Sequence, residues 1–403
     1  MRILQLTPRL AYPPSDGGRV VMLQIAAGMQ RLGAEVRILS LNPKKQQADL
    51  EVARQALAPI RVDAIDIDTS SVLRSLMRIG TPMLVARFYS PQFERELRAL
   101  LEASDVDVVQ IESPFLLPYV PAIRAVSRAV IVLRSLNVEF RIWEQIAARE
   151  KNAAFRVALR FIAGSLRRYE IRHLNTCDAM VPITDDDARD FRALGCTRPM
   201  YVLPGGVDMK EGRPAPASNS AGDEAARIGF LGSLDYRPNQ DGAIWIAEEL
   251  GASVRGEVHV AGSNAPQWLR ERLEASGITF DGEVPDAQEF IRSMDVMIAP
   301  VFSGGGMRIK ILEAMALGTP VVATTIGAAG IGVRHGQDIL LADDAEMFAA
   351  AVTDLLNNPA KAHAIGEAGQ RLVASRYSTE GLARGLLAFY QELTQGRGVQ
   401  PSR

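Results

Sequence analysis

Short, mostly apolar runs alternate along the whole chain with longer segments in which apolar residues recur at helical spacing. Such short runs are typical of parallel strands that are buried on both faces. The first series of predicted strands covers residues 3–6, 36–39, 106–111, 130–133 and 180–183, with predicted helices at 20–32, 93–103 and 185–194. The second series of predicted strands covers residues 227–232, 257–261, 278–280, 296–300 and 321–323.

Two successive series of this kind predict an α/β protein with two doubly wound, Rossmann-like domains. A chain of 403 residues is also longer than one hydrophobic core comfortably serves. Residues 210–226 are rich in Pro, Ala, Ser and Gly and are predicted to form a linker. We therefore expect an N-terminal domain over residues 1–209, a C-terminal domain over residues 227–376, and a site in the cleft between them.

The composition is that of an ordinary globular protein, with 47% hydrophobic and 23% charged residues and a formal net charge of −2. Residues 1–208 carry 28 Lys or Arg against 23 Asp or Glu, whereas the remainder carries 17 against 24. The first half is therefore expected to meet any anionic surface or acceptor. The two cysteines form no metal-ligand pattern and no apolar run approaches a membrane span, so we expect a cytoplasmic protein, soluble or peripheral to a membrane.

The most specific pattern is a glycine-rich loop followed by a charged helix and a buried strand. The loop consists of Ser303, Gly304, Gly305 and Gly306. Its glycines leave backbone N–H groups open, and the N-terminus of the next helix adds a partial positive charge. Arg308 and Lys310 add full charge, and Glu313 follows where it can accept a hydrogen bond from a ribose hydroxyl. The pattern predicts a seat for the diphosphate of a nucleotide-linked substrate.

Three further loops with small residues follow predicted strands. They contain Gly17 and Gly18, then Gly232 and Ser233, then Gly327. Glycines let a backbone approach a ligand closely at a helix N-terminus, but they also form ordinary turns. Both interpretations stay open for each loop on its residues alone. The first loop lacks a G-x-G-x-x-G fingerprint, which argues against a dehydrogenase.

A predicted helix at residues 155–174 carries several arginines among apolar residues. The arginines are Arg156, Arg160, Arg167, Arg168 and Arg172. Such a helix can lie on an anionic membrane surface, or it can pack on one face while the other face is solvated. The four histidines are scattered and form no pair at helical spacing, so we expect no metal site. We also expect no nucleic-acid partner.

Together these motifs resemble the retaining GT-B glycosyltransferases of the bacterial family 4 type. The resemblance rests on residues 14–19, 181–208, 229–239, 282–286, 296–330 and 376–378, which span nearly the whole chain. It implies two Rossmann-like domains that face each other across a cleft, with a helix in residues 377–403 that crosses back to the first domain. It also implies sugar transfer from a nucleoside-diphosphate sugar, most often of UDP or GDP, to a glycan or lipid-linked acceptor in cell-surface polysaccharide synthesis.

The resemblance assigns the donor to the C-terminal domain and the acceptor to the N-terminal domain. Glu313 would contact the donor ribose, the backbone around Val284 would meet the base, and residues 17–18 would approach the diphosphate. Residues 304–306 and the loop with Gly327 would line the donor site. Neither a cofactor nor a divalent metal is implied, because backbone amides, helix ends and cations stabilise the departing phosphate.

The sequence departs from the family pattern in three respects. Gly305 stands where the family has the first of two glutamates, and Ser233 and Pro238 stand where an arginine and a lysine are usual. The usual histidine after a strand of the first domain has no counterpart in residues 110–114. Because a leaving diphosphate needs charge compensation, we expect the two cations beside the glycine-rich loop to supply it.

On the acceptor side the candidates are Glu112, Asn137 and Glu139, which follow two predicted strands of the first domain. For Glu112, contact with the donor sugar or the acceptor and a helix-capping or solvated carboxylate are equally good interpretations. Two other functions also remain open on the sequence: a non-catalytic GT-B protein that binds a sugar nucleotide or an assembly partner, and a GT-B sugar-nucleotide epimerase.

Overall fold

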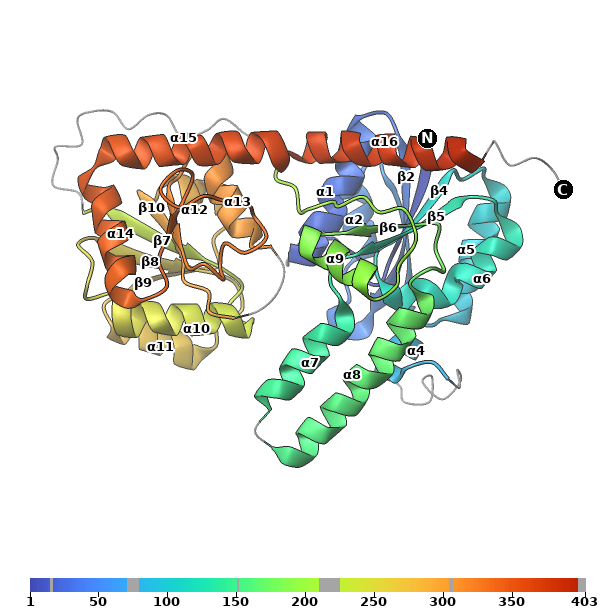
Figure 1. The fold of residues 1–403 in the computed structure, drawn as a ribbon, viewed down its shortest axis with the longest axis horizontal. Coiled ribbons are helices and arrows are strands. Elements are labelled where there is room, and N and C mark those ends of the chain that lie inside the picture. Colours follow the sequence, from blue (N-terminus) through green and yellow to red (C-terminus); the bar gives the residue numbers. More distant parts are fainter. Residues whose placement is uncertain (15–16, 71–79, 151, 210–224, 304–306, 398–403) are drawn as a thin grey trace. The chain divides into compact units, whose positions relative to one another are not determined.

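The computed structural model describes residues 1–14, 17–70, 80–150, 152–209, 225–303 and 307–397. The chain divides into two compact units (Figure 1). Unit 1 comprises Met1–Pro204 and Leu382–Arg403, and unit 2 comprises Gly205–Gly381. Each unit is built around one six-stranded sheet whose strands all pair in parallel.

The sheet of unit 1 has the strand order β3-β2-β1-β4-β5-β6. Its strands are β1 (Arg2–Thr7), β2 (Glu35–Pro43), β3 (Arg61–Ile67), β4 (Val108–Ile111), β5 (Val130–Ser135) and β6 (Ala179–Pro182). The described helices are α1 (Gly17–Arg31), η1 (Lys44–Gln46), α2 (Leu50–Leu57), α4 (Met83–Ala86), α5 (Pro91–Ala103), η2 (Pro114–Tyr119), α6 (Val120–Val126), α7 (Glu139–Arg149), α8 (Ala153–His173), α9 (Asp185–Ala193) and α16 (Thr379–Arg397). This strand order is that of a Rossmann fold.

The central strands of the unit 1 sheet are buried on both faces, which explains why they are largely apolar. One face packs with Phe93 and Leu97 of α5. The other face packs with α1 and with Leu386 and Tyr390 of α16. The predicted return of the C-terminal helix to the first domain is therefore confirmed.

The sheet of unit 2 has the order β12-β11-β10-β7-β8-β9, which repeats the same Rossmann arrangement. Its strands are β7 (Arg227–Leu231), β8 (Glu257–Ala261), β9 (Thr279–Gly282), β10 (Val296–Ala299), β11 (Val321–Ala323) and β12 (Leu340–Leu341). The described helices are α10 (Arg237–Trp245), η3 (Ile246–Leu250), α11 (Gln267–Ala275), α12 (Ala287–Arg292), α13 (Ile309–Ala316), α14 (Ala345–Asn357) and α15 (Pro359–Arg376).

The boundaries between the units differ by a few residues from those predicted at 209 and 376. Val207 belongs to unit 2 because its N–H donates to Tyr377 O at 2.8 Å and its carbonyl accepts from Thr379 N at 3.1 Å. This bridge joins Val207, which precedes the predicted boundary at 209, to residues that follow the predicted boundary at 376. Unit 2 therefore extends past both predicted boundaries, from Gly205 to Gly381. Most of the predicted linker, residues 210–224, lies outside the described residues.

The helices α7 and α8 form a hairpin that extends away from the sheet of unit 1 (Figure 1). In α8, the buried residues all lie from the middle of the helix onward, among them Leu166 and Tyr169. The sequence predicted this helix at 155–174, within two residues of its observed bounds. Among the described residues, no helix combines the length and the apolarity that a membrane span requires.

Candidate functional site

The strand order reverses between β7 and β10 in unit 2, and between β1 and β4 in unit 1. Ligands of doubly wound sheets bind beyond the carboxyl ends of the strands at such reversals. In unit 2 the loops that leave these strands contain Gly232 and Ser233 after β7, and Ser303 after β10. The predicted donor-binding loops thus emerge from the two neighbouring strands at which the fold favours a ligand.

Arg308 lies immediately before α13 and not within it, which corrects the predicted helix with two cations. Its backbone is extended, with φ −87° and ψ 90°, and its side chain does not cap the helix. Arg308 Nη2 instead donates to Ser303 O at 3.2 Å. Burial lowers the pKa of Arg308, and the electrostatic influence of Tyr236 opposes that shift. Because Tyr236 follows β7, the loops after β7 and β10 meet at this guanidinium.

Lys310 and Glu313 lie on α13, and the structure pairs them with each other. Lys310 Nζ is 2.8 Å from Glu313 Oε2, across one helical turn. The lysine side chain is 43% exposed, whereas that of Glu313 is 13% exposed. This pair places a cation and a carboxylate together at the start of α13, where the helix dipole also favours an anion. Their contacts with phosphate and ribose stay predictions.

Glycines at the strand ends of unit 2 serve close packing of the backbone. A Cβ on Gly327 would lie 2.8 Å from Ala299 O, and one on Gly232 would lie 2.8 Å from the Asn239 side chain. Ser233 donates its hydroxyl to Asp235 at 2.6 Å. Val284 packs against the core beneath α13. Each therefore has a structural role, and its contact with a donor stays a prediction.

Two parts of the predicted donor site need separate comment. Gly304, Gly305 and Gly306 lie outside the described residues. In unit 1, Gly17 and Gly18 open α1, directly after the loop that follows β1. Apart from its own helix backbone and chain neighbours, no described residue lies within 4 Å of a Cβ built on Gly17, so packing against the described residues does not require glycine there.

Glu112 is buried in unit 1, which makes the solvated and helix-capping interpretations wrong. Its side chain is fully buried and pairs with Arg134 Nη1 at 3.0 Å. It also accepts from Gln5 Nε2 at 2.6 Å and from the Gln110 amide. Gln110 in turn accepts from the Tyr390 hydroxyl at 2.7 Å, which ties α16 to β4. Arg134 lies on β5 and its partner follows β4, so no local pattern in the sequence joins the two.

Asn137 and Glu139 follow β5, where the structure brings them together with an unpredicted residue, Glu170 of α8. The Glu170 carboxylate accepts from Glu139 N at 3.2 Å and from Phe140 N at 2.9 Å, and so caps α7. Burial raises the pKa of Glu170 to about 8. Burial likewise raises the pKa of Glu139 to about 7, against the lowering effects of Asn137 and Arg9. Two carboxyl groups with raised pKa values thus lie at the start of α7.

Within the described part of the chain, no group of three or more His, Cys, Asp or Glu side chains is placed to hold a metal ion. The side chains that the structure places at the unit 2 strand ends instead include cations, hydroxyls and carboxylates. These groups suit the phosphates and hydroxyls of a nucleotide.

Two family models match the chain, one for each unit. The model described as Glycosyltransferase Family 4 matches residues 15–211, and the model described as Glycosyl transferases group 1 matches residues 225–358. The chain is a family 4 glycosyltransferase. The resemblance seen in the sequence is therefore confirmed over most of its length.

Curated relatives and solved structures agree with this assignment. The chain is 25% identical to the phosphatidyl-myo-inositol mannosyltransferase of Mycolicibacterium smegmatis, over 99% of this chain and 96% of that protein. It is 27% identical to the lipopolysaccharide core biosynthesis mannosyltransferase LpsB of Rhizobium meliloti, over 48% of this chain and 61% of that one.

Among solved structures, sucrose-phosphate synthase of Thermosynechococcus elongatus aligns with a TM-score of 0.70 at 16% identity, over 98% of this chain and all of that one. HepE of Anabaena, solved with UDP and glucose, aligns with a TM-score of 0.70 at 15% identity, over 97% of this chain and all of that one. At such low identity these matches establish the fold, which is GT-B. The comparisons support a glycosyltransferase and neither the non-catalytic nor the epimerase alternative.

Proposed function

We propose that this glycosyltransferase moves a sugar from a UDP- or GDP-sugar to a glycan or lipid-linked acceptor, with retention of anomeric configuration. The main support for a nucleotide-sugar donor is the group of charged side chains where the strand order reverses, between β7 and β10. Arg308 stands before α13, and Lys310 and Glu313 stand within its first turns. The named relatives that are mannosyltransferases support a cell-envelope acceptor.

In this proposal the start of α13 binds the donor diphosphate. Arg308 and Lys310 compensate the charge that develops on the leaving phosphate, and electrostatic stabilisation of this kind usually lowers the reaction barrier more than any other effect. Glu313 accepts a hydrogen bond from the ribose. Retention follows when the acceptor hydroxyl attacks on the face of the leaving group and gives its proton to the donor phosphate. We propose that these cations suffice without a divalent metal.

The donor is identified by a thermal-shift panel of UDP-, GDP- and ADP-sugars with the full chain. A donor present at about 100 times its Kd stabilises the folded state by about 2.7 kcal/mol, which suffices to rank the candidates. We expect one UDP- or GDP-sugar to rank first, with and without EDTA. A panel without any stabilising nucleotide sugar would contradict the proposed donor class, and a shift that disappears in EDTA would contradict metal independence.

We further propose that α8 holds the enzyme at the inner face of the membrane. Val157 and Phe161 stand one turn apart on the side of α8 opposite its buried residues, and their exposed fractions are 66% and 73%. Arg160 and Arg168 are also exposed on this helix. Apolar side chains beside arginines match the two layers of an anionic bilayer surface, acyl chains below and phosphates above.

A further inference from the structure

A polar cavity of unit 1 lies away from the β1–β4 reversal. It has a volume of about 450 Å³ and opens at the carboxyl ends of β2 and β3. Its polar lining consists of Asn42, Gln47, Asp49, Asp66 and Gln92. These residues come from β2, from the segment between η1 and α2, from β3 and from α5. The cavity is therefore a product of the fold and not of one loop.

Asn42 builds one wall of this cavity. It is 3% exposed and stands beside Asp66 in the register of β2 and β3. Asn42 Nδ2 donates to Asp66 Oδ1 at 2.8 Å, and its Oδ1 accepts from Ala48 N at 3.0 Å. Gln47 Nε2 donates to Asp66 Oδ2 at 3.0 Å. The segment after β2 is thereby folded back onto the end of β3.

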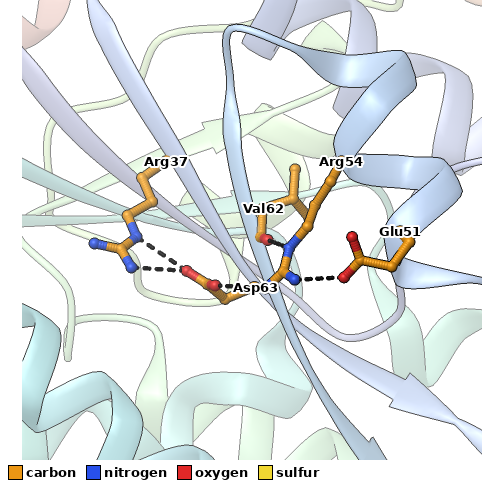
Figure 2. A network of polar contacts seen from close by, with 5 residues as sticks. All are labelled: Arg37, Glu51, Arg54, Val62 and Asp63. Atoms are coloured by element: carbon orange, nitrogen blue, oxygen red, sulfur yellow. Dashed lines mark hydrogen bonds and ion pairs between the residues drawn. The ribbon is translucent and has the colours of Figure 1, made fainter.

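A network of ion pairs fixes α2 against β3 and so holds a second wall (Figure 2). Arg54 of α2 donates to Val62 O at 3.0 Å and to Asp63 Oδ1 at 3.2 Å, and it pairs with Glu51 at 2.6 Å. Asp63 also accepts from Arg37 Nη2 of β2 at 2.8 Å. Asp49, at the N-cap of α2, is held at the cavity by this arrangement.

The lining has hydrogen-bonding capacity to spare. Within the described part of the chain, the exposed side chain of Gln92 makes no hydrogen bond, and Asp49 uses only Oδ1, toward Glu51 N and Val52 N. Among the residues that the structure describes, no Lys or Arg lines the cavity, while two carboxylates do. Like charge disfavours a phosphate or carboxylate ligand there. Amides and carboxylates side by side instead suit hydroxyl groups, which both donate and accept.

We propose that this cavity binds the hydroxyl groups of a neutral hexopyranoside and serves as a subsite for the acceptor glycan. Asp66 and Asp49 accept from the sugar hydroxyls, and the Gln92 amide donates to a sugar oxygen. The identification of this sugar as part of the acceptor rests on the proposed function. The binding itself does not depend on transfer, because the cavity lies wholly within unit 1.

Saturation-transfer NMR on the full chain without donor tests the binding. The probes are methyl α-mannoside and methyl α-glucoside, with mannose 6-phosphate as their charged counterpart. The variants Gln92→Ala and Asp66→Asn change the cavity. Glu102→Gln is the matched control, since Glu102 is exposed on α5, as Gln92 is, but lies outside the cavity lining. Circular dichroism of each variant verifies its fold.

We expect at least one neutral hexoside to bind the wild type and Glu102→Gln, and to bind both cavity variants about tenfold more weakly, equivalent to about 1.4 kcal/mol. Mannose 6-phosphate is expected to bind more weakly than methyl α-mannoside. Absence of binding, unchanged binding in folded Gln92→Ala, or tighter binding of the phosphate would each overturn the subsite. Failure of the donor panel would instead overturn the proposed function and leave this binding intact.

Discussion

Lys310 Nζ lies 2.8 Å from Glu313 Oε2, so the cation and the carboxylate expected at the donor form an ion pair with each other. Binding of a diphosphate competes for the same ammonium group. We therefore expect Lys310→Ala and Arg308→Ala each to lower kcat/KM for the donor by about tenfold or more, equivalent to about 1.4 kcal/mol.

Lys361→Ala is the matched control for Lys310→Ala. Lys361 pairs with Asp354 at 2.5 Å and has a similarly exposed side chain, but it belongs to α15. Its replacement should leave donor kinetics unchanged. Transfer rates within a few-fold of wild type in both Arg308→Ala and Lys310→Ala would show that neither cation compensates the phosphate charge.

The buried Arg134–Glu112 pair predicts a stability effect in unit 1. Removing one partner of a buried pair leaves an uncompensated charge and costs about 3–5 kcal/mol. We expect Glu112→Ala to lower the free energy of unfolding by that order, and Tyr390→Phe to lower it by about 1 kcal/mol. Urea unfolding measures both. An unchanged unfolding midpoint in Glu112→Ala, with a loss of acceptor affinity alone, would instead mark Glu112 as a binding residue.

The carboxyl groups of Glu139 and Glu170 predict a pH dependence at α7. Because burial raises both pKa values, to about 7 and about 8, the folded state binds more protons than the unfolded state above about pH 4.5. The stability contributed by the protonated groups is present at low pH and is lost as the pH rises through about 7 to 8.

Amide hydrogen exchange in residues 139–149 measures this effect locally. After correction for intrinsic rates, the free energy of opening should be lower at about pH 9 than at about pH 5 in the wild type. Glu139→Gln should reduce this difference, since each removed unit of pKa shift is worth about 1.4 kcal/mol. Equal opening energies at both pH values in the wild type would contradict the raised pKa values.

Membrane contact through α8 predicts binding to vesicles. The variant with Val157→Ser and Phe161→Ser should float less with vesicles that contain phosphatidylglycerol, because both side chains leave the acyl layer. The matched control is Met347→Ser, since Met347 is 54% exposed on α14 of unit 2. Equal flotation of the wild type and the α8 variant would exclude this face of α8 as the membrane-binding surface. Binding of a protein partner to the same face would also contradict membrane contact.

The strand series could be predicted from the sequence because buried parallel strands are almost continuously apolar. The strand β3 was missed because Asp63 and Asp66 interrupt it, yet its alternation of polar and apolar residues is the pattern of an edge strand. The two-residue strand β12 is too short to leave a pattern. Helix starts such as that of α9, capped by Thr184, were predictable because capping chemistry is local.

The candidate site was only partly predictable. A glycine-rich loop with nearby cations is contiguous in sequence, so its chemistry can be recognised without a fold. The partnership of Glu112 with Arg134 and that of Glu170 with the start of α7 join residues from different elements. The cavity at Asn42 and Asp66 likewise exists only once β2 and β3 pair. Such features depend on tertiary contacts and leave no local pattern.

A transfer assay that reports both turnover and stereochemistry tests the proposed retaining transfer and its donor site together. The full chain is incubated with UDP-α-glucose or GDP-α-mannose and with octyl α-mannoside as the acceptor, and the anomeric proton of the product is followed by NMR. We expect release of UDP or GDP coupled to an α-linked product, and a matching loss of both in Arg308→Ala. A β-linked product would contradict retention, and nucleotide release at wild-type rate in Arg308→Ala would contradict the donor site at the start of α13.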